Sequence, residues 1–223
     1  MKNKNKKENL VSLTDELFHM VADLSLENQE KFKDIVRIVM NALKEKDAYT
    51  QGHSIRVIDY AVKMGIELEL GPQELKDLEI SAVLHDIGKL SIPDRILKKP
   101  GRLTKEEFSV MQTHSANGEK LLDGISNLEK YKKYIRSHHE RFDGMGYPDG
   151  LKGEEIPLIS RIIFVADTFD AMTSNRPYRN GLPIETAVEE LIKCSNTQFD
   201  PKIVQAFLDV LEKENLDLKK EVI

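Results

Sequence analysis

Apolar residues recur at intervals of three and four positions along most of this chain, and no stretch alternates apolar with polar residues long enough to predict a β-strand. The helical period is clear over residues 10–24 and 32–43, and it returns in several later segments. A chain with this period buries one stripe of each helix against other helices. We therefore predict an all-α fold that begins with extra amino-terminal helices.

Signals for helix starts divide the rest of the chain. Pro72, Pro183 and Pro201 each open an apolar-periodic segment, a position that proline favours. Thr104 and Glu107 are spaced as a capping box. Two stretches rich in glycine and proline, 91–103 and 141–157, are predicted to be irregular. Loops of this length inside a compact helical domain are usually functional.

Composition excludes several classes of protein. The 223 residues are 40% hydrophobic, which is enough for one sizeable core. The most apolar stretches, 35–40 and 162–166, are far shorter than the roughly 18 apolar residues of a membrane helix. Asp15, Glu16 and Asp23 lie where a secretion signal would need apolar residues. We expect a cytoplasmic protein without a membrane span.

Charge and cysteine usage narrow the choice of ligands. A net charge of −5 gives no overall attraction for duplex nucleic acid. Cys194 is the single cysteine of the sequence, so no internal disulfide or thiolate zinc cluster can form. Any bound metal must therefore be held by histidine and carboxylate.

Five of the six histidines stand at predicted helix ends or beside acidic and glycine-rich segments. His85 and Asp86 end an apolar helix, and Gly88 and Lys89 follow within one turn. An aspartate within the helix predicted over 158–172 would be buried at a cost unless it has a partner. The candidate metal ligands are His53, His85, Asp86, His114, His138, His139 and Asp167.

This set of side chains predicts the kind of metal site. Imidazole and carboxylate without thiolate suit iron, manganese or zinc, and seven such groups exceed what one catalytic ion uses, so two ions are favoured. An isolated histidine in a helix is more often an ordinary hydrogen-bonded residue than a ligand. The metal interpretation therefore requires these side chains to converge, which periodicity does not establish.

At these residues the sequence resembles the HD-GYP family, a bacterial branch of the HD-domain metal-dependent phosphohydrolases. The resemblance runs from about Asp47 to about Phe207. It is carried by DAYTQGHSIRV, by LHDIGKLSIPDRILKKPGRL, by the stretch 111–118, by SHHERFDGMGYPDGLKGEEIPLISRIIFVADTFDAMTSNRPYR and by the late FDP. It divides the chain into a tail with helices, 1–45, and a catalytic domain, 46–223.

The resemblance implies an HD-domain helical bundle that hydrolyses cyclic di-GMP to pGpG, and in parts of the family onward to GMP. It makes the seven candidate side chains the metal ligands, with Asp86 as the bridge between ions. Lys89 would meet the scissile phosphate. Arg176 and Arg179 would contact the phosphate or guanine of the substrate, although both could instead cap the preceding helix. Tyr147, in the GYP signature loop, would shape the substrate site.

One departure from the family pattern concerns the number of metals. Some members carry a glutamate four residues before the first histidine, where it reaches a third ion, whereas this chain has Tyr49. A phenol is a poor ligand at neutral pH. We therefore predict two divalent ions per chain, iron or manganese, rather than three.

The implied mechanism is attack on phosphorus by a hydroxide that bridges the metals, with Asp86 and Lys89 as catalytic residues. The general acid stays open among Lys89, Glu140 and a metal-bound water. Glu140 could instead orient a ligating histidine.

Alternative functions are hydrolysis of another cyclic dinucleotide, such as cyclic GMP-AMP, and a catalytically weak sensor of the messenger. A di-iron oxygenase is disfavoured by Lys89 and by the arginines of RPYR. Signalling proteins that bind the GYP loop, and a homodimer formed through the amino-terminal helices, are further expectations.

Overall fold

The computed structural model of the chain describes residues 38, 41, 43, 45, 46, 50–175 and 180–220, except for the side chains of 50, 51 and 215–220. The chain divides into two units, Met1–Asn41 and Ala42–Ile223, and the fold and the site both belong to the second. The helices predicted over 10–24 and 32–43 lie largely outside the described residues. The division into 1–45 and 46–223 stays a prediction.

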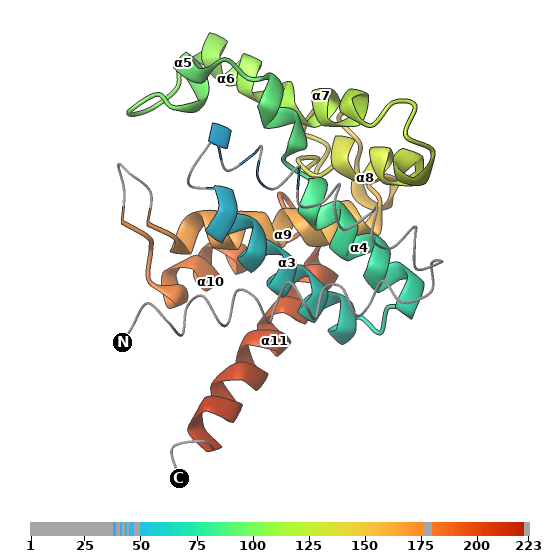
Figure 1. The fold of residues 1–223 in the computed structure, drawn as a ribbon. Coiled ribbons are helices and arrows are strands. Elements are labelled where there is room, and N and C mark those ends of the chain that lie inside the picture. The colour runs from blue at the N-terminus through green and yellow to red at the C-terminus, as the bar shows by residue number, and fades with distance from the viewer. Residues whose placement is uncertain are drawn as a thin grey trace, which may run out of the picture. The chain divides into compact units, whose positions relative to one another are not determined.

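Helices build the second unit, which confirms the predicted all-α class (Figure 1). Among the described residues the only β-type pairing is an isolated bridge between Ser195 and Phe199. The α-helices are α3 (Thr50–Glu67), α4 (Pro72–Leu84), α5 (Asp94–Leu97), α6 (Lys105–Gln112), α7 (His114–Leu121), α8 (Lys132–Arg136), α9 (Leu158–Thr173), α10 (Ile184–Lys193) and α11 (Pro201–Lys220). The 3-10 helices are η1 (Ile87–Ser91), η2 (Ser126–Tyr131) and η3 (Gly153–Glu155).

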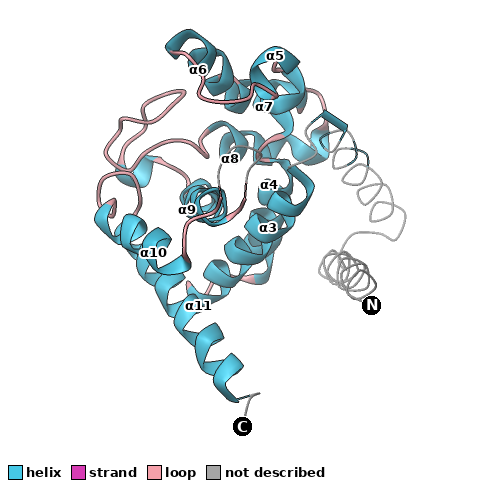
Figure 2. Cartoon of the chain, turned by 90° about the vertical axis from the view of Figure 1, so that its left-hand side faces the viewer, coloured by secondary structure: helices cyan, strands magenta, loops and turns pink. Residues whose placement is uncertain are grey.

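Helix α9 is the centre of this unit. Figure 2 looks along its axis, and it packs against α3, α4, α8, α10 and α11. An aromatic cluster fills the junction with α3 and α11, where Phe169 lies edge-on to Phe207 and to Tyr60 at ring-centroid distances of 4.7 and 5.3 Å. Because α9 is apolar on nearly every side, a polar residue on it needs a partner.

The predicted helix starts are confirmed. Pro72 and Pro201 are the first residues of α4 and α11, and Pro183 is the N-cap of α10. Thr104 and Glu107 form the predicted capping box: the Glu107 N–H donates to the Thr104 Oγ1 atom at 3.2 Å, and the Thr104 N–H donates to the Glu107 carboxylate at 2.8 Å.

The two stretches predicted to be irregular contain short helices that the glycine and proline signals concealed. Within 91–103, α5 forms because the Pro93 carbonyl accepts the N–H groups of Ile96 and Leu97 at 2.9 and 3.0 Å. Within 141–157, η3 begins where the Lys152 N–H donates to the Glu155 carboxylate at 3.0 Å. These segments are therefore more regular than predicted.

Gly88 allows η1 to lie against the start of α7. A Cβ atom at Gly88 would be 1.8 Å from the His114 carbonyl oxygen, which no rearrangement of a side chain would relieve. The glycine of the HDIGK segment therefore sets how closely Asp86 and Lys89 approach His114.

None of the described helices is both long enough and apolar enough to cross a lipid bilayer.

Candidate metal centre

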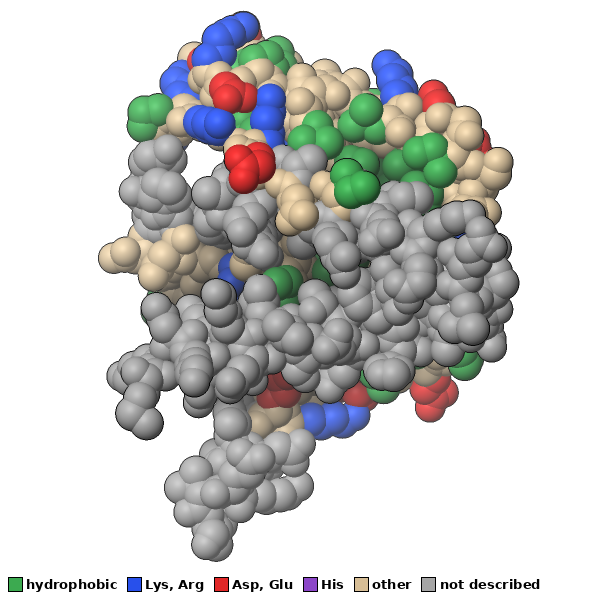
Figure 3. Space-filling model, viewed as in Figure 1, with side chains coloured by type: hydrophobic (Ala, Val, Ile, Leu, Met, Phe, Trp, Pro, Cys, Tyr) green, Lys and Arg blue, Asp and Glu red, His purple; other side chains and the backbone are tan. Residues whose placement is uncertain are grey.

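The structure brings the seven predicted metal ligands together from separate elements. His53 comes from the first turn of α3 and Asp167 from the middle of α9, and the remaining five lie at helix ends or in the turns beside them. The histidines among the seven are buried or nearly so, and no histidine appears among the described side chains on the face drawn in Figure 3. Convergence, which the sequence left open, is therefore present.

One half of the site combines imidazoles with carboxylates. The ligand atoms of His53, His85 and Asp86 all lie within 4.8 Å of one another. The His53 Nε2 atom is 3.2 Å from the Asp167 Oδ1 atom and 3.8 Å from the Asp86 Oδ2 atom. His85 Nε2 is 3.3 Å from the same Oδ2 atom.

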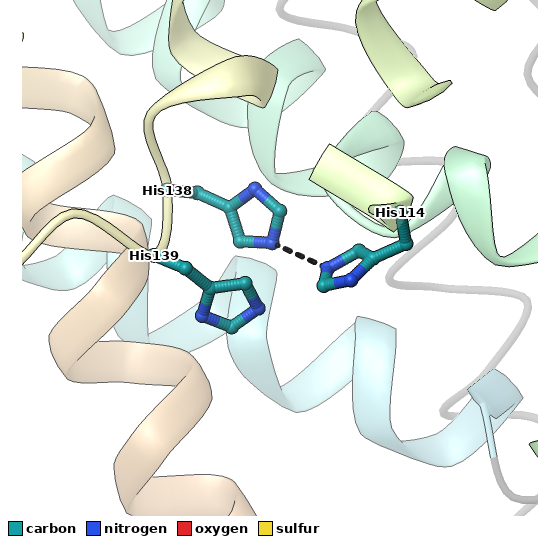
Figure 4. A group of neighbouring side chains, drawn as sticks. All are labelled: His114, His138 and His139. Atoms are coloured by element: carbon teal, nitrogen blue, oxygen red, sulfur yellow. Dashed lines mark hydrogen bonds between the residues drawn. The ribbon is translucent and has the colours of Figure 1, made fainter. Parts of the chain in front are cut away.

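The other half consists of imidazoles. The ligand atoms of His114, His138 and His139 also lie within 4.8 Å of one another, and Figure 4 shows the three rings facing a common space. The Asp86 Oδ1 atom is 3.6 Å from the His114 Nε2 atom. Asp86 therefore presents one carboxylate oxygen to each half of the site.

Three of the histidines are oriented by the helix that precedes them. His85, His114 and His138 each donate Nδ1–H to the backbone carbonyl three residues earlier, at 2.6, 2.8 and 2.6 Å. The last carbonyls of a helix lack a partner within that helix, so they accept this hydrogen bond. A neutral ring that donates from Nδ1 keeps a lone pair on Nε2, and that atom points into the site.

This arrangement leaves lone pairs without donors. His114 Nε2 and His138 Nε2 are 3.2 Å apart, yet each ring already donates from Nδ1, so two neutral rings have no N–H for this contact (Figure 4). Buried His85 Nε2 has no hydrogen-bond partner in the described part of the chain, despite its contact with Asp86. Lone pairs directed at one another fit a divalent cation between them, and the donor set suits iron, manganese or zinc.

The pKa values follow from burial and from the neighbouring charges. Burial lowers the pKa of His138, His139 and His114, and nearby imidazoles lower it further, so these rings are neutral. The pKa of His139 falls to about 3. Burial would also lower the pKa of His53, but its hydrogen bonds to Asp167 and Asp170 outweigh that effect and raise the pKa to about 9.

Asp86 is the buried carboxylate between the two halves of the site. Its side chain is 3% exposed, and the Lys89 Nζ atom donates to its Oδ2 atom at 2.5 Å. Burial would raise the pKa of Asp86, but the charge of Lys89 and the adjacent imidazoles hold it well below its usual range. Lys89 is itself about a quarter exposed, so its ammonium group lies between the buried carboxylate and solvent.

Two residues that support His53 were not predicted as such. The His53 Nδ1 atom donates to the Asp170 Oδ2 atom at 2.7 Å, and the Arg56 guanidinium binds the Asp170 carboxylate and the Ser174 hydroxyl. Asp170 lies three residues after Asp167 on α9 and is completely buried, so it supports His53 rather than facing solvent. Arg56 was missed, although its place three residues after His53 puts both on one helix face.

Glu140 does not orient a histidine. Its Oε1 atom accepts the backbone N–H groups of Asp149 and Gly150 at 2.6 and 3.1 Å, in the GYP loop (residues 144–150). In that loop the Tyr147 ring lies 4.9 Å from the His139 ring, tilted by 32°. Burial raises the pKa of the Tyr147 phenol, which keeps it neutral.

Three predicted residues cannot be placed. Arg176 and Arg179, predicted to contact the substrate, lie outside the described residues, and so does Tyr49, on which the predicted metal count depends.

Comparison with known proteins gives the family. The HD domain family matches residues 37–203. The chain is 41% identical over 214 residues to the "Cyclic di-GMP phosphodiesterase" of Thermotoga maritima, covering 94% of this chain and 58% of the relative. It is 39% identical over 166 residues to the "3'3'-cGAMP-specific phosphodiesterase 3" of Vibrio cholerae, covering 74% of this chain and 36% of the relative.

A solved structure supports the fold. The Bdellovibrio bacteriovorus protein described as a HDG"Y"P protein superposes with a TM-score of 0.63 at 16% identity, covering 90% of this chain and 69% of that protein. The chain spans little more than half of the Thermotoga relative and about a third of the Vibrio relative. The family match over 37–203, together with this fold and the converging histidines and aspartates, shows that the chain belongs to the HD domain family, as its resemblance to HD-GYP proteins predicted.

Proposed function

We propose that this chain is a metal-dependent phosphodiesterase that hydrolyses cyclic di-GMP to pGpG with two divalent ions, iron or manganese. The proposed ligands are His53, His85, Asp86, His114, His138, His139 and Asp167. The 41% identical relative named for this activity supports the substrate. The observation that carries the proposal is the set of inward Nε2 lone pairs on both sides of the Asp86 carboxylate.

The two halves of the site support two ions. A single ion would not use both the group around His53 and His85 and the group of three imidazoles, whereas Asp86 has one oxygen facing each group. When bound, a pair of divalent ions supplies Lewis acidity, which makes water a nucleophile near neutral pH and stabilises charge that develops on phosphate.

The residues of the chain have separate parts in the proposed reaction. Asp86 links the two halves of the site, because one of its oxygens faces each half. Asp170 and Arg56 fix the His53 ring so that its Nε2 atom faces Asp167. Lys89, the partly exposed cation at the edge of the site, binds the phosphodiester and stabilises its added negative charge. Glu140, committed to the GYP loop, is not positioned as general acid.

Turnover and metal content together test the proposal. We expect protein loaded anaerobically with Mn²⁺ or Fe²⁺ to convert cyclic di-GMP to pGpG, and elemental analysis to find two ions per chain. Chromatography of the products distinguishes pGpG from GMP. Tight binding of cyclic di-GMP without turnover by the loaded protein would instead make it a sensor, and three ions per chain would refute the binuclear site.

Hydrolysis of 3′3′-cGAMP is the second candidate function. It is favoured by the 39% identity to the Vibrio cholerae protein whose name specifies that substrate. Both dinucleotides carry the same phosphodiester backbone, so the same Lys89 and metal ligands would serve either. The ratio of kcat/KM for the two substrates under identical metal loading decides between them.

Lys89→Met is expected to weaken catalysis and to strengthen metal binding. The ammonium group lies 2.5 Å from the Asp86 oxygen that a cation would use, so it competes with that cation. Loss of one charge-stabilising donor typically lowers kcat about 10²- to 10³-fold. We expect the Kd for Mn²⁺, measured by isothermal titration calorimetry, to fall about tenfold, the size of a charge-assisted hydrogen bond. Lys89→Arg keeps the charge and is the control; weaker Mn²⁺ binding by Lys89→Met would contradict the competition.

Partners and location complete the proposal. Met145, the second residue of the GYP loop, is 80% exposed and offers an apolar contact to a signalling protein. A cytoplasmic location and a homodimer formed through residues 1–45 are also proposed, and light scattering with and without those residues tests the dimer.

A further inference from the structure

Several contacts join the GYP loop to the turn that carries His138 and His139. The Tyr147 N–H donates to the His139 carbonyl at 3.3 Å, and the Tyr147 ring lies over the His139 ring. Gly146 is pressed against the backbone of the same turn, because a Cβ atom there would be 2.2 Å from the Arg141 nitrogen. The position of Tyr147 is therefore coupled to the position of His139.

Glu140 supplies the inner part of this connection. It follows His139 directly, is 1% exposed, and accepts the N–H groups of Asp149 and Gly150 on a single carboxylate oxygen. Its other oxygen, Oε2, is buried and has no hydrogen-bond partner among the described residues. A buried carboxylate that accepts backbone N–H groups of this loop holds the loop in one place.

Arg136 and Asp149 supply the outer part. The Arg136 Nε and Nη2 atoms donate to the two Asp149 oxygens at 2.7 Å each, and the Arg136 Nη1 atom donates to Glu119 on α7 at 2.6 Å. This bidentate pair fixes the residue that follows Pro148 to the last residue of α8. Asp149 is thus held twice, through its backbone by Glu140 and through its side chain by Arg136.

The geometry points to Glu140, Arg136 and Asp149 as positioning residues that hold the Tyr147 ring against His139 and thereby govern binding of the dinucleotide rather than binding of the metals. We name these three residues the loop clamp. The inference rests on the proposed function, since it treats Tyr147 as a wall of the substrate site. Tyr147 also lies 6.4 Å from the His114 ring, measured between centroids, so the wall borders the half of the site that contains three imidazoles.

Matched variants separate the clamp from a general structural role. Glu140→Ala removes the acceptor for the two amides, whereas Glu140→Gln keeps an oxygen on that side. Asp149→Ala breaks the outer pair at a position whose side chain is 36% exposed, so it leaves the helical core intact. The control is Asp123→Ala, which removes a salt bridge with Lys132, a residue on the same helix as Arg136, without touching the loop.

Three measurements are made on the full-length chain: metal content, KM and kcat for cyclic di-GMP, and amide hydrogen exchange of residues 143–152. In Glu140→Ala and Asp149→Ala we expect two ions per chain as in the wild type, exchange about tenfold faster and KM about tenfold higher, the size of one lost charge-assisted hydrogen bond, with a smaller change in kcat. Glu140→Gln should restore most of the exchange protection and of KM, and Asp123→Ala should change neither.

Unchanged exchange and unchanged KM in both alanine variants would overturn the clamp. Loss of metal in both variants would also overturn it, because the three residues would then act on the turn that carries His138 and His139. If Glu140→Ala does not fold, Asp149→Ala against Asp123→Ala carries the test. If the wild type does not hydrolyse cyclic di-GMP, the proposed function fails. In that case faster exchange in the alanine variants at unchanged metal content still supports the clamp, and unchanged exchange still refutes it.

Discussion

Asp86→Asn is expected to leave at most one metal ion per chain and to lower kcat/KM by a factor of about 10³ or more, as expected when a group central to charge stabilisation is lost. The amide keeps the size of the carboxylate but loses the negative charge that both halves of the site share. It also leaves the Lys89 ammonium beside a neutral group. Elemental analysis and steady-state kinetics on the same preparation measure both effects.

Asp77→Asn is the matched control for this variant. Asp77 also lies on the α4 side of the domain and accepts hydrogen bonds from Lys130 and Tyr131 at 2.6 and 3.3 Å, but it is not among the residues that converge on the site. Its metal content and turnover should equal those of the wild type. Two tightly bound ions in Asp86→Asn would show that Asp86 does not link the two halves.

Acidification from pH 7 to pH 5 is expected to destabilise the metal-free protein through its buried imidazoles. The pKa values of His138 and His139 lie well below 6.5 in the folded chain, so below pH 6.5 the unfolded chain binds protons that the folded chain does not. Stability is therefore lost as the pH falls, by about 2 kcal/mol for each of these histidines at pH 5. His114 contributes in the same direction.

Glu79 has the opposite effect on stability between pH 7 and pH 5, so its contribution must be separated from that of the histidines. Burial raises its pKa to about 7, and its Oε2 atom has no partner in the described part of the chain. The folded chain takes up this proton before the unfolded chain does, which adds about 2 kcal/mol of stability between pH 7 and pH 5. His53, whose pKa is about 9, adds stability that is lost only as the pH rises from 6.5 through 9.

Urea unfolding at pH 7, 6 and 5 in the presence of a chelator measures these contributions. His138 and His139 together predict a loss of about 4 kcal/mol in Glu79→Gln and about 2 kcal/mol in the wild type. His139→Gln should lose about 2 kcal/mol less than its parent over the same range. An unfolding free energy that is equal at pH 7 and pH 5 in Glu79→Gln would contradict neutral, buried imidazoles.

The helices of the second unit were predictable because their signals are local. The apolar period, the prolines at helix starts and the Thr104 capping box each depend on residues within one or two turns. The short helix α5 was missed because Pro93 and Pro100 mark the same stretch as irregular, although the Pro93 carbonyl itself accepts the first hydrogen bonds of the helix. Where some residues favour a helix and neighbouring prolines favour an irregular segment, the tertiary packing decides between them.

The identities of the site residues were predictable only through motifs. More than thirty residues of chain separate any two of His53, Asp86 and Asp167, and no helical period relates them. Arg56 and Glu140 show the limit: both lie beside predicted ligands, yet their partners, Asp170 and the GYP loop amides, are brought near by the fold.

By itself the sequence determined that the chain is helical, that any metal must be bound by nitrogen and oxygen, and which histidines and aspartates stand where a helix ends or needs a buried partner. Only the tertiary structure decided that these side chains meet, that three histidines donate Nδ1–H backwards to their own helices, and that Asp86 faces both groups. The reason is physical: residue type and helical period act over a few positions, whereas the direction of a lone pair depends on how α3, α7, α8 and α9 pack around one another.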